Sequence, residues 1–248
     1  MVVLCALGGA SAWAAPASAV LEEAWQADIA ALHASGVGGN LAAADFVVLA
    51  KGNPVVHHVD TPEGSFAVAA IWIPTALPMA WIAVQDARDR PLSNGVVQEW
   101  LPGGVLGGAR QIYMRLDLPW PVADRQWVSD LGPDAALFAK TEGRVWRFSW
   151  TLADPALAPN PLADAVWVEE NRGSWTLLGV EGGTLCVLSV RSLVGGSIPA
   201  AVSQSFARST LQRTLRTLAE FGPGTAAHYR APHPVLHTPD SGVVPLTP

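Results

Sequence analysis

The stretch "DLPWPVADRQWV", residues 117–128, interrupts a chain that is otherwise rich in apolar residues. Proline breaks helices and central strands, so this stretch marks a corner between two strands. Pro119 and Pro121 stiffen the turn on either side of a tryptophan. Asp124 is placed to cap the turn or to pair with Arg125. We predict a structural role for this corner, because no nucleophile or base lies nearby at a spacing that catalysis could use.

The composition around this corner indicates a large buried core. The chain has 248 residues, of which 50% are hydrophobic and 15% are charged. That is room for one large domain or two small ones, and the chain is too apolar to be disordered. Eleven tryptophans stand against two tyrosines. A tryptophan-rich interior is either a solid core or the wall of an apolar cavity, and the sequence leaves both open.

The charged residues and the cysteines exclude several classes of function. The net charge is −6 and the chain has no basic run, so we expect neither nucleic-acid binding nor a polybasic membrane anchor. The chain has two cysteines, Cys5 and Cys186. Cys186 lies in the apolar run "TLCVLSV" and is expected to be a buried, inert thiol rather than a nucleophile.

The first nineteen residues carry no charge and resemble an export signal. Residues 2–10 form a short apolar run, and Ala17-Ser18-Ala19 fits a cleavage site before Val20. We therefore expect residues 1–19 to be a signal peptide and the protein to be exported, either periplasmic or secreted. The alternative is an N-terminal helix of a cytoplasmic protein, because the basic residues that usually open a signal peptide are missing.

One uncharged run is long enough to cross a membrane. Residues 65–85 contain no charged side chain over 21 positions. Pro74 and Pro78 interrupt the run, and its first half is rich in Val, Ile and Trp. We predict a strand over 65–73 followed by a helix over 75–88, with Thr75 as its N-cap.

The remaining pattern predicts one domain in which about nine strands precede a long helix. A helix is expected over residues 21–35, because apolar residues recur there at helical spacing. The turns "DTPEG", "NRG" and "EGG" separate successive strand-like runs, which favours an antiparallel sheet. These strands are expected among ten strand-like runs, which are 45–51, 54–60, 65–73, 96–101, 109–117, 125–131, 144–152, 165–170, 174–180 and 184–193.

The last predicted helix opens within residues 195–222, with Ser197 as cap and Pro199 in its first turn. Four large residues share one of its faces: Leu211, Leu215, Leu218 and Phe221. The N-terminal half of the helix carries small residues instead, which either leave room for a ligand or allow close packing. Residues 223–248 are rich in proline and are expected to form an extended tail.

These parts resemble the START family of lipid-transfer domains. The resemblance rests on "LPWPVADRQWV" and on "GGSIPAAV", which is similar to the family's entry into its C-terminal helix. It extends over residues 44–221 and implies a START-like lipid-binding domain over 20–222. It also implies an α+β helix-grip fold, in which a curved antiparallel sheet wraps the C-terminal helix and encloses an apolar cavity. In family members that bind steroids, a buried acid–base pair occupies positions that correspond to about Ile112 and Leu131, which are apolar here.

Strand alternation identifies the residues that would line such a cavity. We expect one face of the strands 109–117, 125–131 and 144–152 to look inward, opposite the last helix. The predicted ligand-binding residues are Ile112, Met114, Trp127, Ser129, Leu131, Trp146, Phe148, Trp150, Val202 and Phe206. Candidates for contact with a polar head group are Ser129, Ser203, Ser205, Arg147 and Arg191.

No residue pattern supports a catalytic or metal centre. His57 and His58 are neighbours on a predicted strand and point to opposite faces, so they are poor ligands for one ion. Glu169 and Glu170 face apart for the same reason. We therefore expect a non-catalytic, monomeric carrier without cofactor, which holds one lipid or sterol-like molecule and contacts membranes transiently. The alternatives are a polyketide cyclase that uses the same cavity and a secreted binding module without transfer activity.

Overall fold

The computed structural model describes residues 16–34, 41–61, 64–85, 96–118, 120–193, 195, 200–222 and 236–243. The apolar run of the expected signal peptide, residues 2–10, lies outside these residues, as do Ser197, Pro199 and most of the proline-rich tail. The expected cleavage site lies where the first described helix begins, at Ser18.

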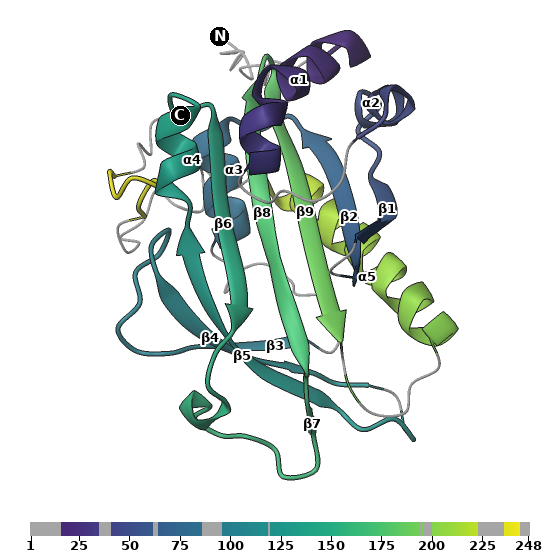
Figure 1. Ribbon diagram of the computed structural model, residues 1–248, viewed down its shortest axis with the longest axis vertical. Coiled ribbons are helices and arrows are strands. Elements are labelled where there is room, and N and C mark those ends of the chain that lie inside the picture. The colour runs from purple at the N-terminus through teal and green to yellow at the C-terminus, as the bar shows by residue number, and fades with distance from the viewer. Residues whose placement is uncertain are drawn as a thin grey trace, which may run out of the picture.

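A nine-stranded sheet forms the centre of the molecule (Figure 1). Its strands run in the order β1-β2-β9-β8-β6-β5-β4-β3, and these neighbours are antiparallel. The two-residue strand β7 pairs with β5 in parallel, which is an exception to the expected antiparallel sheet. The predicted α+β helix-grip fold is confirmed. The strands are β1 Val55–Thr61, β2 Gly64–Ile73, β3 Val96–Trp100, β4 Arg110–Leu116, β5 Arg125–Pro133, β6 Val145–Leu152, β7 Val166–Trp167, β8 Glu170–Val180 and β9 Gly183–Leu193.

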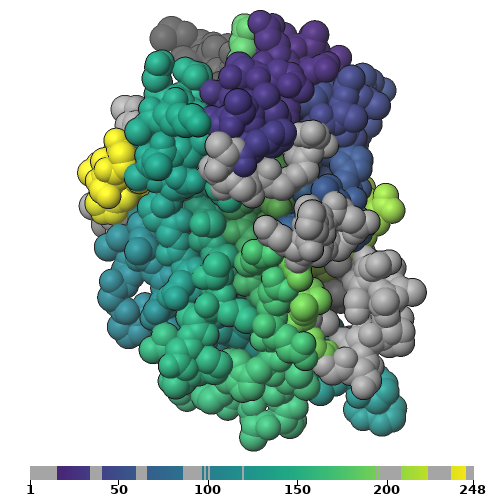
Figure 2. Space-filling model, viewed as in Figure 1, coloured from purple at the N-terminus to yellow at the C-terminus, as the bar shows by residue number. Residues whose placement is uncertain are grey.

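Two helices cover the outer face of the sheet, α1 (Ser18–Ala34) and α2 (Ala43–Leu49) (Figure 1). Leu21, Trp25 and Leu32 of α1 pack against outward-facing residues of the central strands. Arg144, just before β6, forms an ion pair of 3.0 Å with Asp28 of α1. In the space-filling view, α1 and α2 close the upper end of this face (Figure 2).

The inner face carries α3 (Leu77–Gln85) and the long helix α5 (Ala200–Phe221). The 21-residue uncharged run is thus strand β2 followed by α3, as predicted. The expected N-cap is wrong, because α3 begins at Leu77 and the buried Thr75 hydroxyl has no hydrogen-bond partner in the described structure. Within the described residues, no helix has both the length and the apolar character that a membrane crossing requires. In α5, Leu211, Leu215 and Leu218 are buried against β2 and α3, as predicted for the apolar face of this helix, whereas Phe221 of the same predicted face is only half-buried.

Residues 45–51 do not form the predicted strand. Most of this range belongs to helix α2, which ends at Leu49. The Asp45 carboxylate accepts a 2.8 Å hydrogen bond from the Ala42 backbone N–H, and this cap starts the helix. Phe46 and Leu49 are spaced one helical turn apart and are both buried. The β-branched Val47 and Val48, which suggested a strand, are instead exposed on the outer side of the helix.

Two further differences concern β8 and a helix that the sequence pattern missed. The "NRG" segment, residues 171–173, is not a turn but lies inside the continuous strand β8. The missed helix is α4, Ala135–Lys140, which the Asp134 side chain caps by accepting from the Leu137 N–H at 2.9 Å. An aspartate at this position is an N-cap signal that the sequence did contain.

The described part of the tail, residues 236–243, is not extended as expected. It turns back on itself, with a bridge between His237 and Val243. The Trp81 indole N–H donates to the His237 carbonyl at 2.8 Å, and the His237 N–H donates to the Leu106 carbonyl at 2.9 Å. Leu236 is buried in the core next to α3. Gly107, at φ +83°, permits this contact, since a Cβ there would lie 2.1 Å from the His237 carbonyl oxygen.

Candidate functional site

The inner face of the sheet is the candidate site, and strand alternation decides which residues face it. In β6, Trp146 and Phe148 belong to the core that α3 and α5 cover, and Trp150 packs against that core. The register places Leu131 opposite Trp150, so Leu131 shares this face. Ile112 lies opposite Ser129 and Met114 opposite Trp127, which puts these four residues on the inner face as well.

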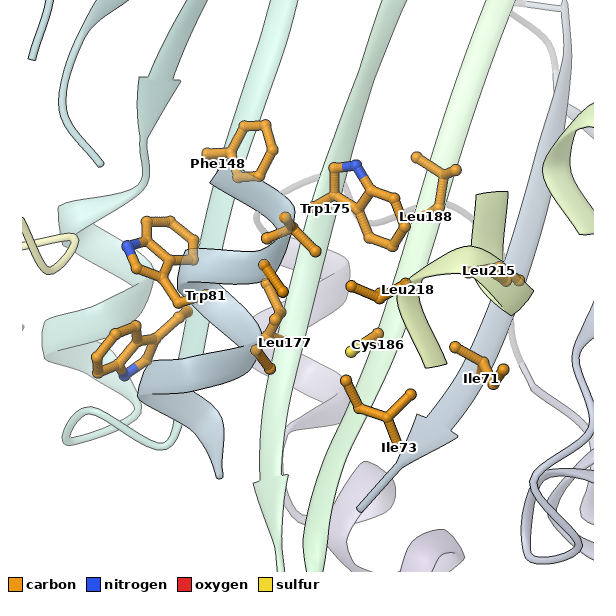
Figure 3. Close-up of a cluster of buried hydrophobic side chains, with 14 of the residues drawn as sticks. Ile71, Ile73, Trp81, Phe148, Trp175, Leu177, Cys186, Leu188, Leu215 and Leu218 are labelled. Atoms are coloured by element: carbon orange, nitrogen blue, oxygen red, sulfur yellow. The ribbon is translucent and has the colours of Figure 1, made fainter. Parts of the chain in front are cut away.

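The part of the inner face that is uppermost in Figure 1 is a closed core, formed by residues buried between the sheet, α3 and α5. Figure 3 shows the side chains of this core. The Trp81 ring of α3 meets Trp146 and Phe148 edge-on, with centroid distances of 5.6 and 5.7 Å. The Trp146 N–H donates to the Gly143 carbonyl at 2.9 Å. Trp146 and Phe148 therefore contact other protein side chains. The residues of the closed core that have no exposed surface are Ala69, Ile71, Ile73, Ala80, Trp81, Ile82, Leu177, Cys186, Leu215 and Leu218.

The lower part of the inner face is less completely covered, and we call it the open zone. Its residues are apolar and face inward, yet each retains part of its exposed surface: Met114, Trp127, Leu131, Trp150 and Val190. Ile112 and Ser129 lie among them and are buried. Inward-facing apolar side chains that the protein covers incompletely provide a surface for a hydrophobic ligand.

A glycine makes room for the Trp150 ring in the open zone. Gly173 of β8 is the register partner of Trp150, and a Cβ on Gly173 would lie 2.4 Å from the Trp150 ring. The Trp150 indole N–H donates to the Asn171 side-chain oxygen at 2.6 Å, which fixes the orientation of the ring. This arrangement explains why "NRG" stays within a strand, since its glycine makes room for an aromatic ring.

Polar side chains mark the boundary between the closed core and the open zone. Arg110 is 5% exposed and extends from β4 until its guanidinium lies 5.6 Å from the centre of the Phe148 ring. It also donates to the Gln85 carbonyl at 3.4 Å. The sequence analysis missed Arg110 and Gln85. Alternation with Ile112 predicts that Arg110 faces inward, and helical spacing puts Gln85 one turn after Trp81.

The Pro-Trp-Pro corner joins the open zone to the segment that precedes α5. The Asp124 carboxylate accepts from the Leu118 N–H at 2.9 Å and so closes the turn, as predicted. Arg125 is buried, and its guanidinium donates to the Ala123 carbonyl and, at 2.9 Å, to the Gly195 carbonyl. Arg125 therefore fixes the start of β5 relative to residue 195, a role that the sequence did not reveal.

Two residues predicted on α5 have no described side chains. Val202 and Phe206 lie in the N-terminal half of the helix, whose backbone is helical. Their side chains lie outside the described part of the chain, as do those of Ser203 and Ser205. Their contact with a ligand stays a prediction.

Both arginines that were predicted as candidates for head-group contact, Arg147 and Arg191, lie on the outer face. Arg147 forms an ion pair of 3.3 Å with Asp134, and burial lowers the pKa of its guanidinium despite this partner. Arg191 donates to Glu170 at 2.8 Å and lies beside the Phe66 ring. Since Val190 faces inward, its neighbour Arg191 faces outward. Neither arginine reaches the open zone.

The other ionisable groups do not form a reactive centre at the open zone. Burial raises the pKa of the Cys186 thiol, which keeps it protonated inside the closed core. Burial also raises the pKa of Tyr113, whose hydroxyl donates to Gln126 at 2.8 Å on the outer face. His57 bonds Asp45 at 2.9 Å next to α2. Within the described residues, no three His, Cys, Asp or Glu side chains cluster as metal ligands would.

Comparison with known proteins identifies the fold. The sequence matches no protein-family model, and a search of curated proteins found no match. Among solved structures, the chain is similar to a STAR-related lipid transfer protein from Xanthomonas axonopodis, at 20% identity and a TM-score of 0.55 over 68% of this chain and 92% of that one. It is also similar to human StAR-related lipid transfer protein 5, at 13% identity and a TM-score of 0.56 over 82% of this chain and 98% of that one. The chain therefore has the START fold.

An aromatase/cyclase from Streptomyces is similar at a lower level. The identity is 14% and the TM-score is 0.41, over 73% of this chain and all of the cyclase. At that score the likeness carries no argument about activity.

Proposed function

We propose that this protein binds one hydrophobic molecule, a lipid or a sterol-like compound, against the open zone and carries it without catalysing a reaction. The observation that supports this proposal most is the contrast between the two parts of the inner face. The closed core is filled by its own side chains, whereas Met114, Trp127 and Trp150 face inward and keep exposed surface. The START fold suggests binding of a hydrophobic ligand, and the open zone lies on the face of the sheet that also carries α3 and α5.

The energetics of such a site would come mainly from apolar contact. Burial of apolar surface contributes about 25 cal/mol per Å². A ligand that covers about 300 Å² of apolar surface, its own and that of the protein, would gain about 7 kcal/mol before the cost of immobilising it. This is sufficient for specific, reversible binding, and a carrier needs reversible binding in order to release its load.

The corner between β4 and β5 is the proposed point of membrane contact. Trp120 is 92% exposed at its tip, and Val122 is 37% exposed nearby. Tryptophan favours the interface between water and lipid because its ring is apolar and its N–H is polar. Arg125 connects this corner to the segment before α5, so membrane contact would occur next to the open zone.

A transfer assay between vesicles tests the function. Donor vesicles of phosphatidylcholine carry a self-quenched NBD-labelled lipid, and acceptor vesicles carry none. We expect the protein to accelerate the gain of fluorescence. The Trp120→Ala variant should slow transfer at least threefold with an unchanged dissociation constant for the labelled lipid, because Trp120 lies outside the open zone. No acceleration by the wild-type protein, together with no binding of the lipid, would refute the proposal.

We also propose that the protein is exported and that residues 1–19 are removed. The proposal rests on the apolar run over residues 2–10 and on the Ala-Ser-Ala site at 17–19. N-terminal sequencing of the mature protein tests it, with Val20 as the expected first residue. An intact leader on protein recovered from the cytoplasm would contradict it.

A further inference from the structure

Two buried polar side chains have no hydrogen-bond partners in the described part of the chain, one on α3 and one on the inner face of β5. Gln85 is 1% exposed and Ser129 is 2% exposed. Within the described structure, neither the amide oxygen and nitrogen of Gln85 nor the hydroxyl of Ser129 has a partner. More than nine in ten buried polar groups in native proteins are satisfied, because an unsatisfied one keeps its full desolvation cost. Two such groups at the end of an apolar surface point to a bound polar group.

Arg110 connects these two side chains. It lies opposite Leu131, two register positions from the pair of Ile112 and Ser129, and therefore shares their inward face. Its guanidinium reaches over this face to the carbonyl of Gln85, at 3.4 Å. Ser129 therefore lies near the base of the Arg110 side chain and the backbone of Gln85 lies at its tip, at the boundary where the closed core begins.

We propose that Gln85 and Ser129 bind the head group of the hydrophobic ligand, and that this head group is a single uncharged hydroxyl. This inference rests on the proposed function of the open zone. An amide and a hydroxyl both donate and accept hydrogen bonds. A ligand hydroxyl accepts from the Gln85 N–H or the Ser129 O–H and donates its own proton to the other side chain's oxygen. The apolar body of the ligand then extends from this end along Leu131, Met114 and Trp150.

Other head groups fit these two side chains less well. A carboxylate accepts hydrogen bonds but donates none, so the buried amide oxygen of Gln85 would remain unsatisfied. The Arg110 guanidinium would attract a carboxylate, but it already donates to the Gly108 and Gln85 carbonyls and lies over the Phe148 ring. A phosphodiester head group is larger and charged, and here it would lie against Phe148 and Leu131, with a high cost of desolvation. The site therefore favours a hydroxyl over both.

The test compares three probes that differ only at one end: hexadecan-1-ol, hexadecane and hexadecanoic acid. Each is delivered from the same cyclodextrin carrier and competes with an NBD-labelled lipid for the full-length protein. We expect the alcohol to bind about tenfold more tightly than the alkane, which corresponds to about 1.4 kcal/mol, and also more tightly than the acid at pH 8.

Two variants assign this preference to residues. Ser129→Ala and Gln85→Met remove the polar groups with little change in volume, so the ratio of alcohol to alkane affinity should fall toward one while the alkane keeps its affinity. The midpoint of unfolding of each ligand-free variant should stay unchanged or rise, because an unsatisfied buried group is removed. Ser174→Ala is the matched control, since Ser174 is equally buried on the outer face. It should leave the ratio unchanged.

The outcomes separate this inference from the proposed function. Equal affinity of the wild-type protein for alcohol and alkane would overturn the head-group site, for example because a buried water satisfies the two side chains, and would leave the proposed function standing. Tighter binding of the acid would overturn the uncharged hydroxyl as the head group. Failure of all three probes and of the labelled lipid to bind would refute the proposed function itself. These comparisons use the wild-type protein and do not depend on the folding of any variant.

Discussion

Two tryptophans on the same strand and the same face provide the sharpest test of the division between closed core and open zone. Trp146 packs against Trp81 in the closed core, and Trp150 lies four residues further along β6, over Gly173. We expect Trp146→Ala to destabilise the fold and Trp150→Ala to weaken ligand binding. The two substitutions remove the same side chain, so a difference between them reflects position alone.

The expected magnitudes follow from the surroundings of each ring. Removing the buried Trp146 leaves a cavity and should lower the free energy of unfolding by about 3–5 kcal/mol. A ligand lying on one face of the Trp150 ring covers about a third of a tryptophan side chain's surface, or about 70 Å². At about 25 cal/mol per Å², losing this contact costs about 1.7 kcal/mol, which raises the dissociation constant about 20-fold. Because Trp150 is partly exposed, its loss should cost about 2 kcal/mol of stability or less.

The assay combines urea denaturation with titration of an NBD-labelled lipid, at a temperature where both variants are fully folded. We expect Trp146→Ala to retain a dissociation constant within about threefold of wild type, because its ring is buried in the closed core against Trp81 and Phe138. An unchanged dissociation constant for Trp150→Ala would refute the assignment of the open zone. If both variants lost affinity in proportion to their loss of stability, the assignment of the open zone would be refuted as well.

Three further substitutions test individual contacts. Gly173→Ala should lower the free energy of unfolding by about 1–3 kcal/mol and weaken lipid binding, since the new methyl group displaces the Trp150 ring; wild-type values in urea denaturation and titration would contradict the packing. Arg125→Ala should cost about 1.5–3 kcal/mol, because the Gly195 carbonyl loses a charged donor, and a loss below 0.5 kcal/mol in the same assay would argue against this link. Burial raises the pKa of Tyr113 from its usual value of 10.0, so the tyrosine stabilises the fold below pH 10 and this contribution is lost as the pH rises through the folded-state value. Tyr113→Phe should therefore flatten the fall in stability above pH 10, and parallel curves for both proteins would contradict the assignment.

The sequence predicted the strands well wherever alternation was supported by a buried face. In β6, the alternation of Trp146, Phe148 and Trp150 with polar residues predicted both the strand and its inward side. The corner at residues 117–128 predicted the boundary between β4 and β5, because two prolines restrict the backbone locally. The family resemblance of the same residues predicted the helix-grip fold.

The differences arose where a tertiary contact outweighed the local pattern. Val47 and Val48 favour a strand by propensity, but the cap at Asp45 and the burial of Phe46 form a helix instead. Gly173 reads as a turn residue, yet its missing side chain accommodates a ring from the neighbouring strand. The cap at Asp45 is local, but the burial of Phe46 and the packing of a ring over Gly173 depend on other elements and cannot be read from a single segment.

The candidate site was only partly predicted, and the reason is similar. Alternation identified which strand residues face inward, but it did not separate those filled by α3 from those left partly exposed. The position of Trp81 decides that division, and it depends on how α3 packs on the sheet. Gln85 and Arg110 were not predicted because the pattern of apolar residues does not include polar side chains, although their spacing from Trp81 and Ile112 indicates the inner face.

Native mass spectrometry of the purified protein tests the central claim most directly, with organic extraction and identification of any lipid that is released. We predict one hydrophobic molecule per chain, either co-purified or taken up from a mixture of lipids and sterols, and its displacement by the NBD-labelled lipid. A protein that is folded by circular dichroism and stays free of ligand after incubation with that mixture would contradict the account.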